Sequence, residues 1–128
     1  MITMFKIYEK IKTNIKDIKV GDYIIIRDMV ELKNVSDFEF LDIVKNKIGK
    51  VIKDSETNSV SWANLSIEYP EELPKTNRTI LKVGAIGPQG MPSAGTVIFI
   101  GKYSITKAFI SPNENELKVI LKSEQFDL

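Results

Sequence analysis

Short apolar runs separated by turn residues dominate this sequence, and they constrain its fold more than any other feature. Each run is bounded by Gly, Pro, Asn, Asp or Ser, and most are rich in Ile, Val and Phe. Runs of this length, with turn signals at fairly regular spacing, are typical of a small β-barrel or a β-sandwich. The predicted strands lie at residues 23–27, 48–53, 60–69, 78–83, 96–100, 105–110 and 116–122.

Two other segments have helical periodicity. The apolar residues of 3–16 recur at steps of three and four, which predicts an amphipathic helix, although its β-branched isoleucines leave a strand open. Ser36 and Glu39 form a capping-box pattern and predict a second helix at 37–46. We therefore expect one mainly β domain over residues 1–128. It would be a small SH3-like barrel or sandwich of six to seven short antiparallel strands with one or two short helices.

The composition excludes several kinds of chemistry. The chain has 128 residues, enough for a sizeable core, and its formal net charge is only +1. It contains no Cys and no His. Thiolate nucleophiles, imidazole bases and the usual zinc or haem ligands are therefore missing. We expect no catalytic residues, no metal and no cofactor, and a protein that is not an enzyme.

The distribution of charge and apolar residues bears on location and partners. No apolar run approaches the roughly 18–20 residues of a membrane span, and the N-terminal sequence has no signal-peptide core. We expect no membrane contact and a place in the cytoplasm of a bacterial host or in a virion, since richness in Ile, Lys and Asn suggests a low-GC bacterium or its phage. The chain is basic at both ends and acidic in its middle. This pattern is typical of a solvated surface with a local charge bias; the alternative is that the unlike patches meet in a protein partner or in copies of the same chain. For its partners we expect another protein or copies of itself.

A glycine-rich stretch, "VGAIGPQGMPSAG", interrupts the apolar runs. Gly84, Gly87 and Gly90 recur at every third position, but three triplets are too few for a collagen helix. The P-loop pattern is absent too. We expect a loop of about 12 residues at 84–95 that either connects two strands or, with Met91, contacts a partner.

The segment 60–69 contains two apolar sets on opposite parities. Leu65, Ile67 and Tyr69 form the better core set, which would leave Trp62 facing solvent as a binding residue. A β-bulge at residues 63–64 would instead return the indole to the core. Both alternatives stay open.

Arg27 and Arg78 are the only arginines of the chain. Arg27 follows an apolar strand on the same parity as Tyr23 and Ile25. Its planar guanidinium could hold an anionic ligand, but an ion pair at the strand end is the more favoured interpretation. A pocket formed by both arginines and the glycine stretch would bind a nucleotide.

Residues 18–69 resemble the KOW-type SH3-like small barrel. The resemblance is carried by "IKVGDYIIIRD", "NKIGKVIKD" and "VSWANLSIEY", with Gly49 as the motif glycine. It implies a barrel that binds RNA, DNA or protein. The short basic loop usual in that family is replaced by about 20 residues that contain acidic side chains, which opposes phosphate contact. These are Glu31, Asp37, Glu39 and Asp42.

We therefore expect a small non-catalytic binding or assembly protein of phage or low-GC bacterial type. It would act through protein–protein contacts, as a virion component or as a host-directed inhibitor. Nucleic-acid binding is a less favoured alternative, and sequestration of a nucleotide is a third.

Overall fold

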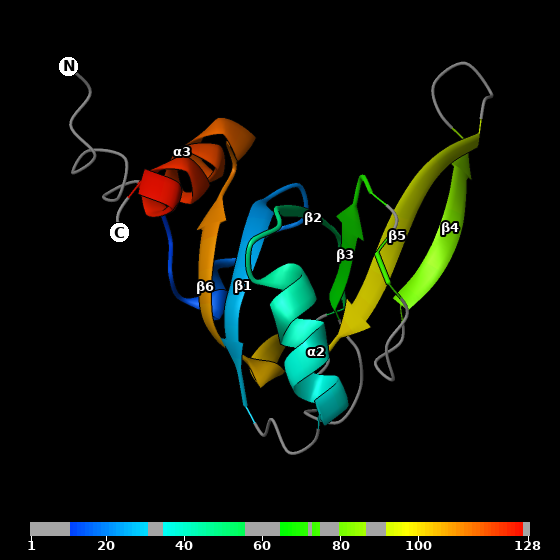
Figure 1. Ribbon diagram of the computed structural model, residues 1–128, viewed down its shortest axis with the longest axis horizontal. Coiled ribbons are helices and arrows are strands. Elements are labelled where there is room, and N and C mark those ends of the chain that lie inside the picture. Colours follow the sequence, from blue (N-terminus) through cyan, green and yellow to red (C-terminus); the bar gives the residue numbers. More distant parts are fainter. Residues whose placement is uncertain are drawn as a thin grey trace.

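The structure is a computed structural model that describes residues 11–30, 35–55, 65–71, 73–74, 80–86 and 92–126. The described residues form a six-stranded sheet in the order β4-β5-β3-β2-β1-β6, and all neighbouring strands run antiparallel (Figure 1). This open sheet confirms the mainly β class without singling out a barrel or a sandwich. Its strands are β1 (Tyr23–Met29), β2 (Gly49–Asp54), β3 (Leu65–Tyr69), β4 (Ile80–Ile86), β5 (Pro92–Ile100) and β6 (Ile105–Ser111).

Two helices cover opposite faces of the sheet. Successive residues of a strand point to opposite faces. Ile24 and Ile26 of β1 pack in one cluster with residues of α2 (Val35–Val44), whereas Ile25 packs with residues of α3 (Glu114–Phe126). In Figure 1, α2 crosses in front of the strands and α3 lies at the β6 end of the sheet. Short 3-10 turns, η1 (Ile15–Asp17) and η2 (Lys102–Ser104), precede β1 and β6.

The α2 side holds the larger core. Leu65, Ile67 and Tyr69 of β3 are completely buried in it, which confirms the core set expected from their shared parity. The other members come from β1, α2, β2, β5, β6 and the segments between them. Ile67 and Tyr69 pack so closely on Gly49 of β2 that no side chain fits there. An added Cβ would lie 2.3 Å from Ile67 Cγ2 and 2.9 Å from Tyr69 Cζ.

The α3 side holds a smaller core. Ile25 packs there with Leu117 and Ile120 of α3 and with Ile11, all of them buried. Phe109 of β6, the register partner of Ile25, is only partly buried beside them. The α3 side therefore combines a small apolar cluster with an aromatic ring, that of Phe109, which is only partly buried.

The strand expected at 116–122 is wrong, because this segment belongs to α3. Leu117, Val119 and Leu121 alternate as in a strand, but the buried pair is Leu117 and Ile120, three residues apart as on a helix. The helix start is also held locally, since the Ser111 hydroxyl donates to Glu116 at 2.6 Å.

The helix expected at 3–16 is wrong for its described part. Residues 11–14 form no helix: Lys12 forms a β-bridge with Ile110 of β6, and Asn14 is extended before the chain enters η1. Residues 3–10 lie outside the described residues. The strand alternative, based on the β-branched isoleucines, is met only by the single bridge at Lys12 and not by a continuous strand.

The loop expected at 84–95 is much shorter in the structure. Strand β4 continues to Ile86, which pairs with Pro92 at the start of β5, so that residues 87–91 connect the two strands. Pro92 can begin a strand because the first position tolerates a missing amide donor. Glycines 84 and 95 therefore lie within paired strands rather than in a loop.

The remaining expected elements are confirmed with shifted ends. The helix expected at 37–46 is α2, and the strands expected at 23–27, 48–53 and 105–110 are β1, β2 and β6. The strands expected at 78–83 and 96–100 correspond to β4 and β5. Of the segment 60–69, residues 65–69 form β3. Residues 60–64, which contain Trp62 and the alternative bulge at 63–64, lie outside the described residues.

Candidate binding site at the β6 edge

A β-bulge in β1 places Arg27. Ile26 pairs with Ala108 and Asp28 pairs with Lys107, so Arg27 is the extra residue between two successive partners on β6. Bulges bend a strand and increase its local twist. Arg27 keeps the parity of Ile25, and its side chain lies on the same α3 side of the sheet, where it meets Glu124.

On that side Glu124 of α3 binds the guanidinium through both oxygens. Arg27 Nη1 donates to Oε2 at 2.7 Å and Nη2 donates to Oε1 at 2.5 Å. The Arg27 side chain is 21% exposed and that of Glu124 is 44% exposed. The ion pair expected for Arg27 is therefore present, but Arg27 lies within β1 rather than at the end of the strand, because β1 continues to Met29.

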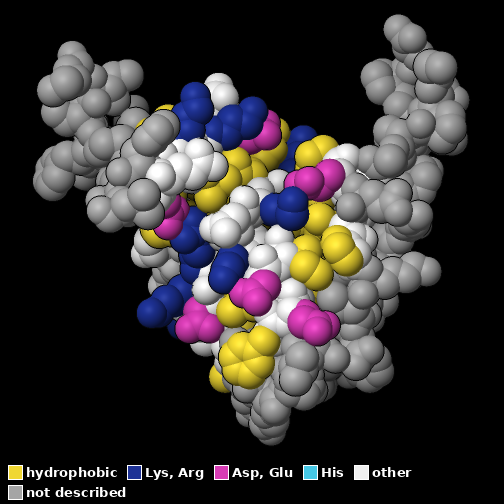
Figure 2. Space-filling view, viewed as in Figure 1, with side chains coloured by type: hydrophobic (Ala, Val, Ile, Leu, Met, Phe, Trp, Pro, Cys, Tyr) yellow, Lys and Arg dark blue, Asp and Glu magenta, His cyan; other side chains and the backbone are white. Residues whose placement is uncertain are grey.

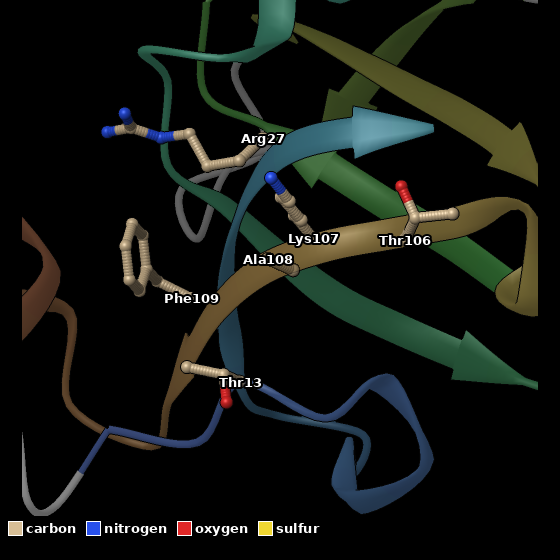
Figure 3. A pocket seen from close by; sticks show the side chains of 6 residues that line it. All are labelled: Thr13, Arg27, Thr106, Lys107, Ala108 and Phe109. Atoms are coloured by element: carbon tan, nitrogen blue, oxygen red, sulfur yellow. The ribbon is translucent and has the colours of Figure 1, made fainter. Parts of the chain in front are cut away.

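The ring of Phe109 completes this arrangement. The Arg27 Cζ atom lies 5.4 Å from the ring centroid, within the range of a cation–π contact. Figure 3 shows the guanidinium and the ring projecting to the same side of β1 and β6. An aromatic ring and an arginine at a half-open surface are residue types enriched in protein interfaces.

A cavity of about 370 Å³ lies against these residues. Its size is near the small end of the range for ligand sites. Figure 3 shows that its lining comes from three segments: the stretch before η1, the bulge of β1, and β6. The lining residues are Thr13, Arg27, Thr106, Lys107, Ala108 and Phe109.

The cavity lies at the outer edge of the sheet, where β6 is the last strand in the order, and extends over the α3 side to Arg27 of β1. Of the described residues before η1, which begin at Ile11, Lys12 pairs with this edge through one β-bridge to Ile110. Lys12 N donates to the Ile110 carbonyl at 2.9 Å, and Ile110 N donates to the Lys12 carbonyl at 2.8 Å. Lys107 lies on β6, three residues before Ile110. Its side chain is exposed and has no ion pair with any described residue.

A buried ion pair lies away from this cavity. Lys102 Nζ is 3.1 Å from Asp54 Oδ2, and both side chains are only 9% exposed. The pair joins the end of β2 to η2 and leaves Asp54 Oδ1 without a hydrogen-bond partner. It lies beside no described cavity, and we interpret it as structural.

The structure does not bring the sequence-predicted site residues together. Arg27 lies on β1, and Gly84 lies on β4, four positions away in the sheet order, which is about 19 Å at the usual spacing of strands. A single pocket containing both is therefore not formed. The other predicted site residues lie outside the described residues: Trp62, Arg78, Gly87, Gly90 and Met91.

Sequence reasoning missed most of the cavity. The parity of residues 105–110 places Lys107 and Phe109 on one face of a strand, but it does not show which strand lies beside them. The contact with Arg27 depends on pairing between β1 and β6, which are far apart in the sequence. No local signal marks Thr13 or Thr106.

The described residues contain no group of three or more acidic residues that could hold a metal ion, and none of their helices is long and apolar enough to cross a membrane. On the face shown in Figure 2, acidic and basic side chains lie interspersed with hydrophobic ones. Comparisons with protein-family models, curated proteins and solved structures gave no match.

Proposed function

We propose that the protein is a non-catalytic binding protein that recognises another protein at the β6 end of its sheet. The observation that carries this proposal is the cavity along the outer edge of β6. It combines an aromatic ring, an arginine and a lysine with two hydroxyl groups. Such a combination offers apolar contact, charge and hydrogen bonds to a polypeptide.

The two cations that line the cavity, Arg27 and Lys107, favour a polypeptide over a nucleotide as the ligand. Both terminal nitrogens of Arg27 are already bound to Glu124, so the fork that would hold a phosphate is occupied. Lys107 alone offers an unpaired charge among the cations that line the cavity. A phosphate site would be expected to gather several free donors.

The sequence adds two supports. The resemblance of residues 18–69 to KOW-type SH3-like barrels suggests a binding module, and the barrel geometry of that family remains part of the proposal. The absence of Cys and His supports a non-catalytic role. A role in assembly or in inhibition of a host protein, in a phage or a low-GC bacterium, is consistent with these features.

A selection with matched variants tests the proposal. A displayed library of protein fragments is enriched against the wild-type chain, and the Kd of each enriched fragment is measured for two variants. Thr106→Arg fills the cavity, whereas Val20→Arg adds the same group at a site that is 60% exposed in the turn before β1. We expect Thr106→Arg to weaken binding at least tenfold and Val20→Arg to change it less than twofold.

Two results would contradict the proposal. One is a selection that enriches no fragment, and the other is a set of fragments that bind both variants as tightly as wild type. Thermal unfolding of both variants checks that Thr106→Arg preserves the fold. Turnover of a nucleotide or peptide that is lost on changing one carboxylate would overturn the non-catalytic part.

A further inference from the structure

We infer that the partner presents an acidic side chain, which pairs with the amine of Lys107 while an apolar side chain beside it rests on the ring of Phe109. This inference rests on the proposed function and specifies the chemistry of the segment that the cavity recognises. Lys107 carries the inference, because it lines the cavity, is exposed and forms no ion pair within the described part of the chain.

Two opposed β-bulges surround Lys107. In β1 the extra residue is Arg27, which precedes Asp28, and in β6 it is Thr106, which precedes Lys107. Asp28 and Lys107 are register partners between these two bulges. Bulges increase the local twist of paired strands and are frequent beside functional sites. Both extra residues line the cavity, so the irregular part of the β1–β6 pair forms its wall.

Lys107 and Asp28 lie opposite one another, yet they form no ion pair. Opposite charges at directly opposed positions of an antiparallel pair ordinarily attract. The Oδ1 atom of Asp28 instead accepts a hydrogen bond from Met29 N at 2.8 Å, within its own strand. Glu124, the acid that reaches Arg27 from α3, is bound to both of its terminal nitrogens. Both acids are thus engaged elsewhere, and the Lys107 amine is left for an acid of another molecule.

The polar groups of the cavity are mainly hydrogen-bond donors. A lysine amine and an arginine guanidinium donate only, and the exposed hydroxyls of Thr13 and Thr106 can donate as well. Among the described residues that line the cavity, none is acidic. A carboxylate supplies the acceptors that this lining lacks. Its contact with a lysine is a charge-assisted hydrogen bond, which is stronger than a neutral one.

Phe109 provides the apolar part of the site. Its ring is only partly buried, and Figure 3 shows that Phe109 and Lys107 leave β6 on the side of the Arg27 guanidinium. Residues two apart in a strand point to the same face, with their Cα atoms about 7 Å apart. That spacing suits a segment in which an acidic and an apolar side chain lie within one or two positions of each other.

The distribution of charge favours another protein as the source of the acid. The chain's own residues 1–10, which lie outside the described residues, carry two lysines and one glutamate. A basic segment of this kind is repelled by Lys107. In the acidic middle of the chain, which a second copy would have to offer, several carboxylates already bind lysines of the same chain. These are Asp42, Asp54 and Glu71.

Matched charge changes test the inference on the fragments enriched above, synthesised as peptides. We expect these peptides to share an acidic residue. Lys107→Glu should weaken their binding at least tenfold, because it places like charges together. Lys53→Glu, at an exposed lysine of β2 that does not line the cavity, should change it less than twofold.

A double-mutant cycle then identifies the pair. Replacing the acidic residue of the peptide by the corresponding amide should weaken binding to the wild-type chain about fivefold, as for an ion pair at a partly exposed site. The same replacement should weaken binding to Lys107→Gln less than twofold. Thermal unfolding of Lys107→Gln checks the free protein. A fall in Tm of more than about 4 °C would overturn the inference, because the amine would already be paired within the chain.

Four further results would overturn the inference. Peptides that are sensitive to Thr106→Arg, yet bind Lys107→Glu as tightly as wild type, would do so and leave the proposed function standing. An oligonucleotide whose binding depends on Lys107, where no acidic peptide binds, would replace the carboxylate by a phosphate. A wild-type chain that sediments as a dimer, with Lys107→Glu as a monomer, would assign the acid to a second copy. A selection without any bound fragment would overturn the inference and the proposed function together.

Discussion

The two sides of β1 differ in what they bury. On the α2 side, Ile24 and Ile26 belong to a large apolar cluster that extends across β2, β3 and β5. On the α3 side, Ile25 meets only a small cluster, and the next residue on that face is the ion-paired Arg27. Apolar burial contributes roughly 25 cal/mol per Å², whereas partly exposed ion pairs contribute little. We infer that the α2 side provides most of the stability and that the α3 side is free to serve binding.

The largest expected difference comes from one substitution made on each side. Leu65 on the α2 side and Leu117 on the α3 side are both completely buried. We expect Leu65→Ala to lower the free energy of unfolding by about 4 kcal/mol and Leu117→Ala by about 2 kcal/mol, within the range for such cavities. The smaller value reflects a helix that can settle into a cavity at the margin of the fold. Urea unfolding measures both, and equal losses would contradict the comparison.

The second prediction concerns close packing on the α2 side. Gly49→Ala would place a Cβ atom 2.3 Å from Ile67 Cγ2, so the core must shift. We expect a loss of about 3 kcal/mol in unfolding free energy, at the upper end of the cost of overpacking. Gly21→Ala is the matched control, because an added Cβ there meets nothing within 4 Å and only the positive φ of 96° opposes it. Its loss should be about 1 kcal/mol, and a Gly49→Ala loss no larger than this would show that the core is loosely packed.

The third prediction uses a buried hydroxyl on the α2 side. Complete burial raises the pKa of Tyr69 well above its ordinary value near 10, because the tyrosinate would lose its hydration. The folded state therefore stays protonated at a pH where the unfolded chain releases the proton. The contribution of Tyr69 to stability is constant below pH 10 and decreases above it, by up to about 1.4 kcal/mol per pH unit.

Tyr69→Phe should remove this alkaline decrease. It should change stability little at pH 7, since the Tyr69 hydroxyl has no hydrogen-bond partner in the described part of the chain. Tyr103→Phe, at a tyrosine that is 48% exposed, is the control. Urea unfolding of the three proteins between pH 7 and 11 gives the comparison. If wild type and Tyr69→Phe lose stability in parallel above pH 10, Tyr69 is not buried as described.

The α2 side could be predicted from the sequence to a useful extent. The shared parity of Leu65, Ile67 and Tyr69 identified the core face of β3, because alternation within one strand is local information. The capping pattern of Ser36 and Glu39 located α2 for the same reason. A strand or helix that follows one clear period can be recognised without knowing its neighbours.

The α3 side could not be predicted in this way. Leu117, Val119 and Leu121 satisfy a strand pattern as well as a helical one, and only burial of Ile120 decides between them. The cavity depends on a bulge at Arg27 and on pairing between β1 and β6. Both result from tertiary contacts between distant segments, which leave no local pattern in the sequence.

The smallest expected effect concerns the ion pair between Arg27 and Glu124, which lies on the α3 side. Glu124→Gln keeps the shape of the side chain but removes the charge that binds Arg27 through both terminal nitrogens. The Glu124 side chain is 44% exposed, so water and salt already screen this pair. We expect a loss of about 0.5–1 kcal/mol in unfolding free energy at low salt, which should shrink at about 1 M salt, where the Debye length is about 3 Å.

Glu114→Gln provides the control within the same helix, since Glu114 lies 3.6 Å from Lys118 in an exposed pair. Its loss should be about half a kcal/mol or less. A loss of 3 kcal/mol or more for Glu124→Gln would mean that Arg27 becomes an uncompensated buried charge. In that case the α3 side would contribute to the unfolding free energy as strongly as the α2 side does. The β6 end of the sheet could then not rearrange around a partner without loss of stability. A small, salt-sensitive loss would instead show that α3 is held to the bulge of β1 weakly enough for this side of the sheet to adapt to a partner.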